Sequence, residues 1–194
     1  MKTKRTLTDR TDALPALAEA FRKHGFEGAS LAILSRATGL GKGSLYNFFP
    51  GGKEEMMDAV LADIDRWFVT TIFTPLEQAR DPAAAIRTMT AEVTVYFRSG
   101  GRVCLVGWIG LGSSGDAFAV RVKTYFARWI SALARCVQSG GVPSLLAVQL
   151  AEETVSGIQG AIVLARALGE EALFLRIVRR HEAALLDALA RHTR

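Results

Sequence analysis

The spacing of apolar residues is the feature of this 194-residue sequence that most restricts its fold. Nearly every segment repeats its apolar residues at the three- and four-residue intervals of an α-helix, and convincing alternation at period two is absent. Residues 11–24, for example, place Leu14, Leu17, Ala18 and Phe21 on one helical face. The sequence therefore predicts an all-α protein.

Glycine, proline and capping residues divide the chain into predicted helices. We expect Thr11 or Asp12 to cap the first helix, Ser30 the second and Asp81 the first helix after residue 75. Glycines stop several of these helices. The expected ranges are 11–24, 30–38, 41–48, 53–73, 81–98, a glycine-weakened segment in 102–112, 116–138, 144–167 and 170–192.

The positive charge is confined to the first quarter of the chain. Residues 1–53 hold nine Lys or Arg and four Asp or Glu, whereas the remainder holds 15 of each sign, so the net charge of +5 belongs to the first part. A basic N-terminal segment joined to a neutral remainder is typical of a protein that contacts a polyanion. The alternative is that residues 1–53 are a solvated basic tail.

Composition argues against several classes of protein. Cys104 and Cys136 lie in separate apolar runs, which favours reduced, packed thiols over a disulfide. No apolar run reaches the ~18 residues of a membrane span, and MKTKRTLTDR has no signal-peptide core behind it. We expect a soluble cytoplasmic protein with no membrane partner. The three histidines have no metal-ligand partner at suitable spacing, so no metal is expected.

A glycine motif at 110–115 imitates a nucleotide-binding loop. GLGSSG fits G-x-G-x-x-G after an apolar segment, but no second strand with an acid about 20 residues on follows it. We interpret it as a break between helices. Because no nucleophile and base can be paired either, the sequence favours neither an enzyme nor a cofactor.

Residues 30–48 have the organisation of a helix-turn-helix, braced by the helix at 11–24. Gly39 suits the tight turn, and Leu34 and Leu45 hold the two short helices together. Lys42, Ser44, Tyr46 and Asn47 are left for the outer face. In a DNA major groove Asn47 suits a base edge, Lys42 guanine or phosphate, and Ser44 and Tyr46 phosphate or a thymine methyl.

Four further residues are candidates for contact with the DNA backbone. Ser30 and Lys53 lie at helix N-termini, which favour phosphate. Gly43 allows close approach of the backbone, and Arg5 belongs to an N-terminal arm suited to the DNA backbone or the minor groove.

The ordered combination of residues between about 8 and 60 resembles the DNA-binding domain of TetR-family transcriptional regulators. The loop FPGGKEE is one residue longer than the usual FPSKEE, and this form resembles the LmrA/YxaF-like subgroup. Gly41 departs from the usual Ser or Thr cap. The matching residues are Phe21, Gly25, Phe26, Ser30, Leu34, Gly39, Lys42, Gly43, Leu45, Tyr46, Phe49, Lys53 and Glu54.

The resemblance implies three parts: a DNA-binding domain at 1–53, a connecting helix at 54–74, and a ligand-binding and dimerisation domain at 75–194. It implies a cavity for a small hydrophobic effector, for which we select Phe97, Trp108, Phe126, Trp129 and Gln159. It also implies a homodimer through the last two helices, with Val155, Ile158, Ile162, Ile177 and Leu185 as the selected contacts. The alternative is that these residues form only the core within one protomer.

The expected function is that of a homodimeric transcriptional regulator, and we expect a repressor in preference to an activator. It would bind a palindromic DNA operator and be released by its effector. The alternative is a ligand-binding or adaptor protein of the same fold that has lost specific DNA binding. Gly41 is the one hint of that alternative.

Overall fold

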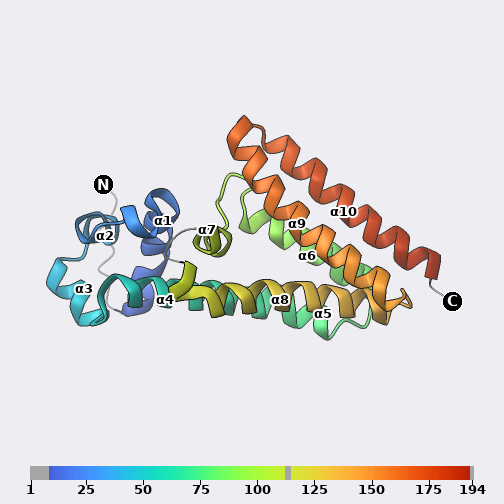
Figure 1. The fold of residues 1–194 in the computed structure, drawn as a ribbon, viewed down its shortest axis with the longest axis horizontal. Helices are drawn as coiled ribbons and strands as arrows, with labels where there is room; N and C mark the ends of the chain where they lie inside the picture. Colours follow the sequence, from blue (N-terminus) through green and yellow to red (C-terminus); the bar gives the residue numbers. More distant parts are fainter. Residues whose placement is uncertain (1–8, 112–114, 193–194) are drawn as a thin grey trace. The chain divides into compact units, whose positions relative to one another are not determined.

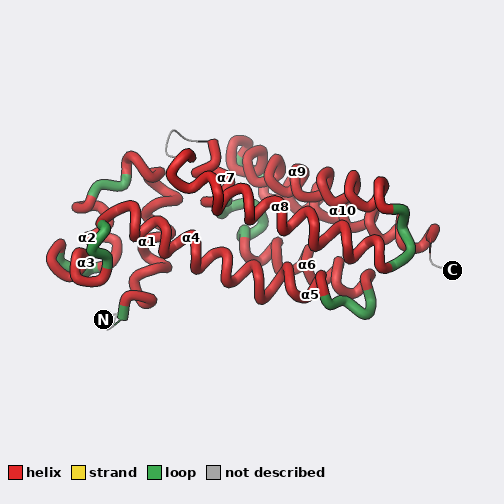
Figure 2. The backbone as a smooth tube through the Cα atoms, turned by 60° about the horizontal axis from the view of Figure 1, so that its bottom comes forward, coloured by secondary structure: helices red, strands yellow, loops and turns green. Residues whose placement is uncertain are grey.

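A computed structural model describes residues 9–111 and 115–192 of the chain. Every element of secondary structure in this part is helical, which confirms the predicted all-α class (Figure 2). The elements are α1 (Arg10–Gly28), α2 (Leu31–Thr38), α3 (Lys42–Phe48), α4 (Gly52–Phe68), the π-helix η1 (Val69–Phe73), α5 (Thr74–Glu77), α6 (Pro82–Tyr96), α7 (Leu105–Leu111), α8 (Gly115–Ser139), α9 (Ser144–Leu168) and α10 (Glu171–His192).

Side-chain caps and left-handed glycines set several helix ends. The Ser30 hydroxyl accepts a hydrogen bond from the Ile33 amide at 3.4 Å, and Asp81 accepts one from Ala84 at 3.0 Å. Gly39 ends α2 in the left-handed conformation, with a φ of 73°. These predicted caps and this predicted stop are confirmed.

The first helix begins earlier than predicted. Its cap is Asp9, whose carboxylate accepts a hydrogen bond from the Thr11 amide at 3.2 Å, so the prediction of Thr11 or Asp12 was wrong. At the other end Gly25, with a φ of 69°, takes the chain out of helical geometry, and a short helical stretch then continues to Gly28. The predicted stop at Gly25 is thus a kink.

The long helix after residue 52 contains a change of helical type. α4 passes directly into the π-helix η1 and then into α5, whose first turn contains Pro75. A π-helical turn widens the helix and changes which side chains share a face. The periodicity of the sequence predicted one helix from 53 to 73 and did not reveal this change.

The backbone contacts divide the chain into two compact units. The N-terminal unit comprises the described residues up to Asp65 together with Leu105–Ala119; the C-terminal unit comprises Arg66–Cys104 and the described residues from Val120 on. We had expected boundaries after residues 53 and 74. The main difference from this expectation is that residues 105–119 belong to the N-terminal unit. α7 lies in this segment, although it begins more than 30 residues after the end of the predicted connecting helix.

Each unit has its own apolar core. In the N-terminal unit Leu17, Phe21, Leu34, Leu45 and Phe49 are fully buried. In the C-terminal unit α10 packs along α9 and against α6 (Figure 1).

Two glycines permit this packing in the C-terminal unit. A Cβ at Gly157 would lie 2.1 Å from His181 Nε2, and a Cβ at Gly100 would lie 2.8 Å from the Cβ of Ala165. α10 is also joined to α6 by a hydrogen bond that the Thr90 hydroxyl donates to Glu182.

Two sequence expectations about the chain as a whole can be compared with the described residues. Within them, no helix is both long and apolar enough to cross a membrane. Cys104 and Cys136 are also buried within the described residues and form no disulfide there, as expected.

Candidate nucleic-acid interface

The turn between α2 and α3 is held by side-chain hydrogen bonds. The Thr38 hydroxyl donates to the Leu34 carbonyl at 2.8 Å and accepts from the Leu40 amide at 3.3 Å. The Ser35 hydroxyl donates to the Leu40 carbonyl at 2.6 Å. These bonds fix the turn at Gly39, and sequence analysis missed them, although Ser and Thr next to a turn often bond to the local backbone.

α3 buries one side chain and exposes most of the others. Leu45 is fully buried, and Gly41 caps the helix without a side-chain hydrogen bond. The predicted DNA contacts of this helix are all exposed: Lys42, Gly43, Ser44, Tyr46 and Asn47. The seven-residue helix therefore presents a short polar surface of the composition that reads DNA bases and phosphates.

The double glycine after α3 has a definite structural role. Gly52 has a φ of +68°, which residues with a side chain rarely adopt. The Gly51 amide donates to Glu55 Oε2 at 2.7 Å, and Arg10 forms an ion pair with the same carboxylate at 2.9 Å. The Arg10 guanidinium also lies 4.7 Å from the centre of the Phe49 ring. The loop thus ties the start of α1 to the end of α3 and the start of α4.

The other three predicted DNA contacts have different settings. Ser30 is exposed, and its hydroxyl already caps α2. Lys53 is half-buried, with its Nζ 4.5 Å from the centre of the Phe26 ring. Arg5 lies outside the described residues.

An aromatic cluster occupies the C-terminal unit around Phe68. The Phe68 ring lies 4.9 Å from Tyr125 and 5.3 Å from Trp129, measured between ring centres. The remaining rings of the cluster, all in contact with Phe68, are Trp67, Phe73, Tyr96 and Phe97. Because the chain widens into the π-helix η1 directly after Phe68, the cluster lies at a local irregularity, and such turns are frequent at functional sites.

Most of the predicted effector contacts lie in or near this cluster. Phe97 and Trp129 are fully buried members of it, and the half-buried Phe126 lies edge-on to Tyr125 at 4.9 Å. Trp129 Nε1 and Gln159 Nε2 are buried nitrogen atoms without a hydrogen-bond partner. Buried donors normally have an acceptor, so an unpaired one calls for an explanation.

Trp108 does not belong to this group. It lies in α7, within the N-terminal unit, and is 45% exposed. Its Nε1 is 3.6 Å from the position a Cβ would take at Gly25. The expectation that Trp108 shares a cavity wall with Phe97 and Trp129 assumed that α7 packs in the body, whereas α7 packs on α1.

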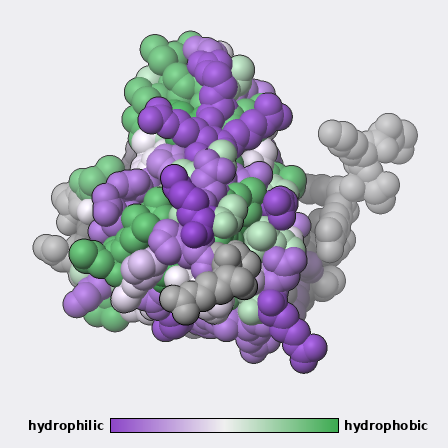
Figure 3. All heavy atoms as spheres, turned by 90° about the vertical axis from the view of Figure 1, so that its right-hand side faces the viewer, coloured by the Kyte–Doolittle hydropathy of each residue, from purple (hydrophilic) through white to green (hydrophobic). Residues whose placement is uncertain are grey.

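The predicted dimer contacts lie mostly inside the protomer. Val155, Ile158, Ile162 and Leu185 are buried and Ile177 is half-buried. Hydrophobic spacing selected the apolar face of each helix, and that face is covered by the chain's own helices. Figure 3 is turned about the vertical axis, so heights in it match those in Figure 1. It shows hydrophobic surface near the top of the picture, which is the level of the turn between α9 and α10. The exposed apolar side chains of α9 are Leu145, Val148, Val163, Leu164 and Leu168.

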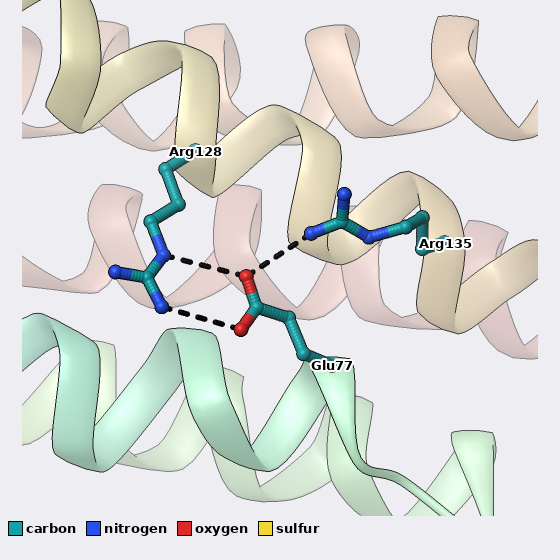
Figure 4. Close-up of polar contacts among 3 residues, drawn as sticks. All are labelled: Glu77, Arg128 and Arg135. Atoms are coloured by element: carbon teal, nitrogen blue, oxygen red, sulfur yellow. Dashed lines mark hydrogen bonds and ion pairs between the residues drawn. The ribbon is translucent and has the colours of Figure 1, made fainter.

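An exposed ion-pair network joins α5 to α8 (Figure 4). Glu77 accepts two hydrogen bonds from Arg128, at 3.3 and 3.2 Å, and one from Arg135 at 3.0 Å. Exposed ion pairs contribute little free energy individually, although a bidentate pair restrains geometry better than a single bond. We interpret this network as a link between two helices of the body.

Neither of the rival sites considered from the sequence forms in the described residues. Gly110 lies within α7 with no strand before it, and residues 112–114 of the GLGSSG motif fall outside the description. The described part of the chain also has no group of three or more potential metal ligands.

The fold and the exposed α3 define a helix-turn-helix protein with a helical C-terminal unit, and the comparisons with known proteins agree. Residues 14–60 match the family model of the bacterial regulatory proteins of the tetR family. Residues 82–181 match the model of the LmrA/YxaF-like transcriptional regulator C-terminal domain. This chain belongs to the TetR family of transcriptional regulators and to its LmrA/YxaF-like group.

Two relatives from Bacillus subtilis strain 168 are similar in sequence. The HTH-type transcriptional regulator LmrA is 31% identical over 88 residues, which are 45% of this chain and 47% of LmrA, so this match spans less than half of that relative. The uncharacterized HTH-type transcriptional regulator YxaF is 27% identical over 168 residues, 81% of this chain and 87% of YxaF.

Solved structures share the fold at low identity. A TetR transcriptional regulator from Legionella pneumophila has a TM-score of 0.76 and 18% identity, and the match covers 95% of this chain and 99% of that one. The regulator CifR, as a cysteine mutant complexed with 26-base-pair operator DNA, has a TM-score of 0.68 and 23% identity over 97% and 98% of the two chains.

Proposed function

We propose that this protein binds a palindromic DNA operator as a homodimer, represses transcription there, and is released by a small hydrophobic effector. The observation that carries the proposal is the exposed surface of α3. Its one buried residue, Leu45, anchors the helix, and the side chains of Lys42, Ser44, Tyr46 and Asn47 are exposed. This arrangement suits insertion of α3 into the major groove, as in helix-turn-helix proteins.

The chemistry of α3 divides its contacts into two kinds. Asn47 offers the donor and acceptor pair that recognises adenine, so it is proposed to specify sequence. Lys42 is exposed and positively charged, which supports a contact with phosphate or guanine. Ser44 and Tyr46 complete the surface on the same helix.

The aromatic cluster and two buried, unpaired nitrogens, one of which belongs to the cluster residue Trp129, support an effector site in the C-terminal unit. An apolar molecule that stacks on these rings and carries a hydrogen-bond acceptor would satisfy Trp129 Nε1 or Gln159 Nε2. Phe97, Phe126, Trp129 and Gln159 are therefore retained as proposed effector contacts, and Trp108 is not.

A second copy of the chain is the proposed partner of the exposed face of α9. Leu145, Leu164 and Leu168 expose apolar surface there, and Gly160 has open space around it that permits close helix approach. A two-fold dimer also matches the symmetry of a palindromic site. The proposed contacts thus move from the buried residues selected by sequence to exposed ones on the same helix.

Binding measurements with DNA fragments from around the protein's own gene test this function. At near-physiological salt we expect one inverted repeat to bind far more tightly than unrelated DNA. Asn47→Ala should relax the preference at one base pair by roughly 1–3 kcal/mol, while Lys42→Ala should weaken binding to guanine or phosphate. Lys123→Ala is the matched control, because it removes an exposed lysine of the C-terminal unit. Weak binding without sequence preference would favour the adaptor alternative.

A further inference from the structure

The ammonium group of Lys53 is held on an aromatic ring. Its Nζ lies 4.5 Å from the centre of the Phe26 ring, and Lys53, the second residue of α4, is half-buried. The face of an aromatic ring attracts a cation, and the attraction limits the positions that the lysine side chain samples. The Phe26 ring therefore determines where the positive charge of Lys53 is found.

Two other rings hold Phe26. Its ring stacks against Phe21 at 6.2 Å and meets Phe118 edge-on at 5.5 Å between ring centres. Phe21 is fully buried and Phe118 is 5% exposed. Because the half-buried Phe26 ring rests against Phe21 and Phe118, we expect a smaller side chain at position 118 to let the Phe26 ring shift. Lys53, Phe26 and Phe118 thus form a continuous set of contacts within the N-terminal unit.

Phe118 reaches this set of contacts from a distant part of the sequence. It lies in α8, and backbone contacts assign residues 105–119 to the N-terminal unit. The same helix carries Tyr125 and Trp129 of the aromatic cluster.

We propose that Phe118 is a positioning residue for DNA binding: acting through Phe26, it fixes the ammonium of Lys53 where it contacts one DNA phosphate. The proposal rests on the proposed operator binding and deepens it, because it names a residue outside the helix-turn-helix that sets the strength of a backbone contact.

A first test needs no DNA. The ε-methylene protons of Lys53 should resonate upfield in the NMR spectrum because they lie over the Phe26 ring, and Lys53→Arg assigns the signal by removing it. Phe118→Leu should move this signal toward the position of an exposed lysine, whereas Phe118→Tyr should retain it. Val120→Ala, at an exposed position of the same helix, is the control and should leave it unchanged.

A second test measures DNA affinity as a function of salt. Loss of one phosphate contact makes the slope of log K against log salt concentration less steep by about one. Because both protomers of the dimer carry the substitution, Lys53→Ala and Phe118→Leu should each reduce the slope by up to about two, with an affinity about two- to fivefold lower per protomer for Phe118→Leu. Phe118→Leu should have no further effect in the Lys53→Ala background, and Phe118→Tyr should restore the slope.

The outcomes separate this proposal from the proposed function. An unchanged Lys53 signal in Phe118→Leu, or additive effects of the two substitutions on the slope, would overturn the role of Phe118. A thermal unfolding midpoint of Phe118→Leu near that of the parent protein confirms that the fold persists. If the midpoint is much lower, the Lys53 signal and the salt slope are compared in Phe118→Tyr instead. If the parent protein binds no DNA, operator binding fails, and the NMR test still decides whether Phe118 positions Lys53.

Discussion

Gly52, like Gly25 and Gly39 of the candidate DNA-binding unit, has a positive φ that favours glycine. Its φ of +68° costs a residue with a Cβ about 1–2 kcal/mol. We expect Gly52→Ala to lower the free energy of unfolding by about that amount, measured by urea denaturation. Gly43→Ala is the control, because its Cβ would meet nothing within 4 Å and alanine favours a helix. Equal stability of the two variants would contradict this account of the loop.

Cys136 is expected to be chemically inert in the folded protein. Burial, and to a lesser degree the negative charge of Asp81, raises the pKa of its thiol to about 11. Because the thiolate is the reactive form, labelling with a thiol reagent at pH 8 should be slow until the protein unfolds.

The same raised pKa predicts a dependence of stability on alkaline pH. The ordinary value of this pKa is 9.0, so the unfolded chain loses the proton first, and the stabilisation is complete below pH 9 and is lost as the pH rises toward about 11. Urea denaturation across this range, compared with Cys136→Ala, checks the prediction. An identical pH profile for the two proteins would contradict it.

At the scale of elements, the packing of α9 on α10 depends on Gly157. A Cβ there would overlap the His181 ring, with 2.1 Å to Nε2. Gly157→Ala should therefore destabilise the protein by roughly 1–3 kcal/mol, the usual range for overpacking. His181→Ala in the same chain should recover part of this loss, because it removes the overlapping ring. Simple addition of the two single effects in a double-mutant cycle would show that the steric explanation is wrong.

The exposed side of α9 carries a separate prediction about assembly. Leu164 is 45% exposed, and we expect Leu164→Glu to weaken dimerisation, because a carboxylate would be buried in an apolar contact. Val95→Glu is the control, at an exposed position of α6. Sedimentation at several protein concentrations should show a higher dimer dissociation constant for Leu164→Glu alone. An equal dimer dissociation constant for both variants would show that the dimer surface does not include Leu164.

For the whole molecule, the sequence predicted features that depend on local chemistry. Ser30, Asp81 and Gly39 act within one turn of their own positions, and all three do what their residue types indicate. The exposure of Asn47 and the burial of Leu45 follow from the period of a short helix. These features needed no knowledge of distant contacts.

Features that depend on distant contacts were not predictable from periodicity. Apolar spacing marks Ile158 and Leu185 as buried, but it does not say whether the chain itself or a partner covers them. We expect Trp108 to line a cavity because residues 102–115 form a glycine-broken segment of the predicted ligand-binding domain, whereas α7 packs on α1. Apolar spacing predicted an ordinary helix through Val69–Phe73 and did not reveal the π-helix there.

The central claim is that α3 reads a discrete palindromic site. The most direct measurement is recovery of genomic fragments bound by the purified protein, followed by sequencing, with Asn47→Ala processed in parallel. We predict that the parent protein recovers fragments sharing one inverted repeat, and that Asn47→Ala loses the preference at a symmetric pair of positions within it. Fragments that share no motif, recovered equally by both proteins, would contradict the claim.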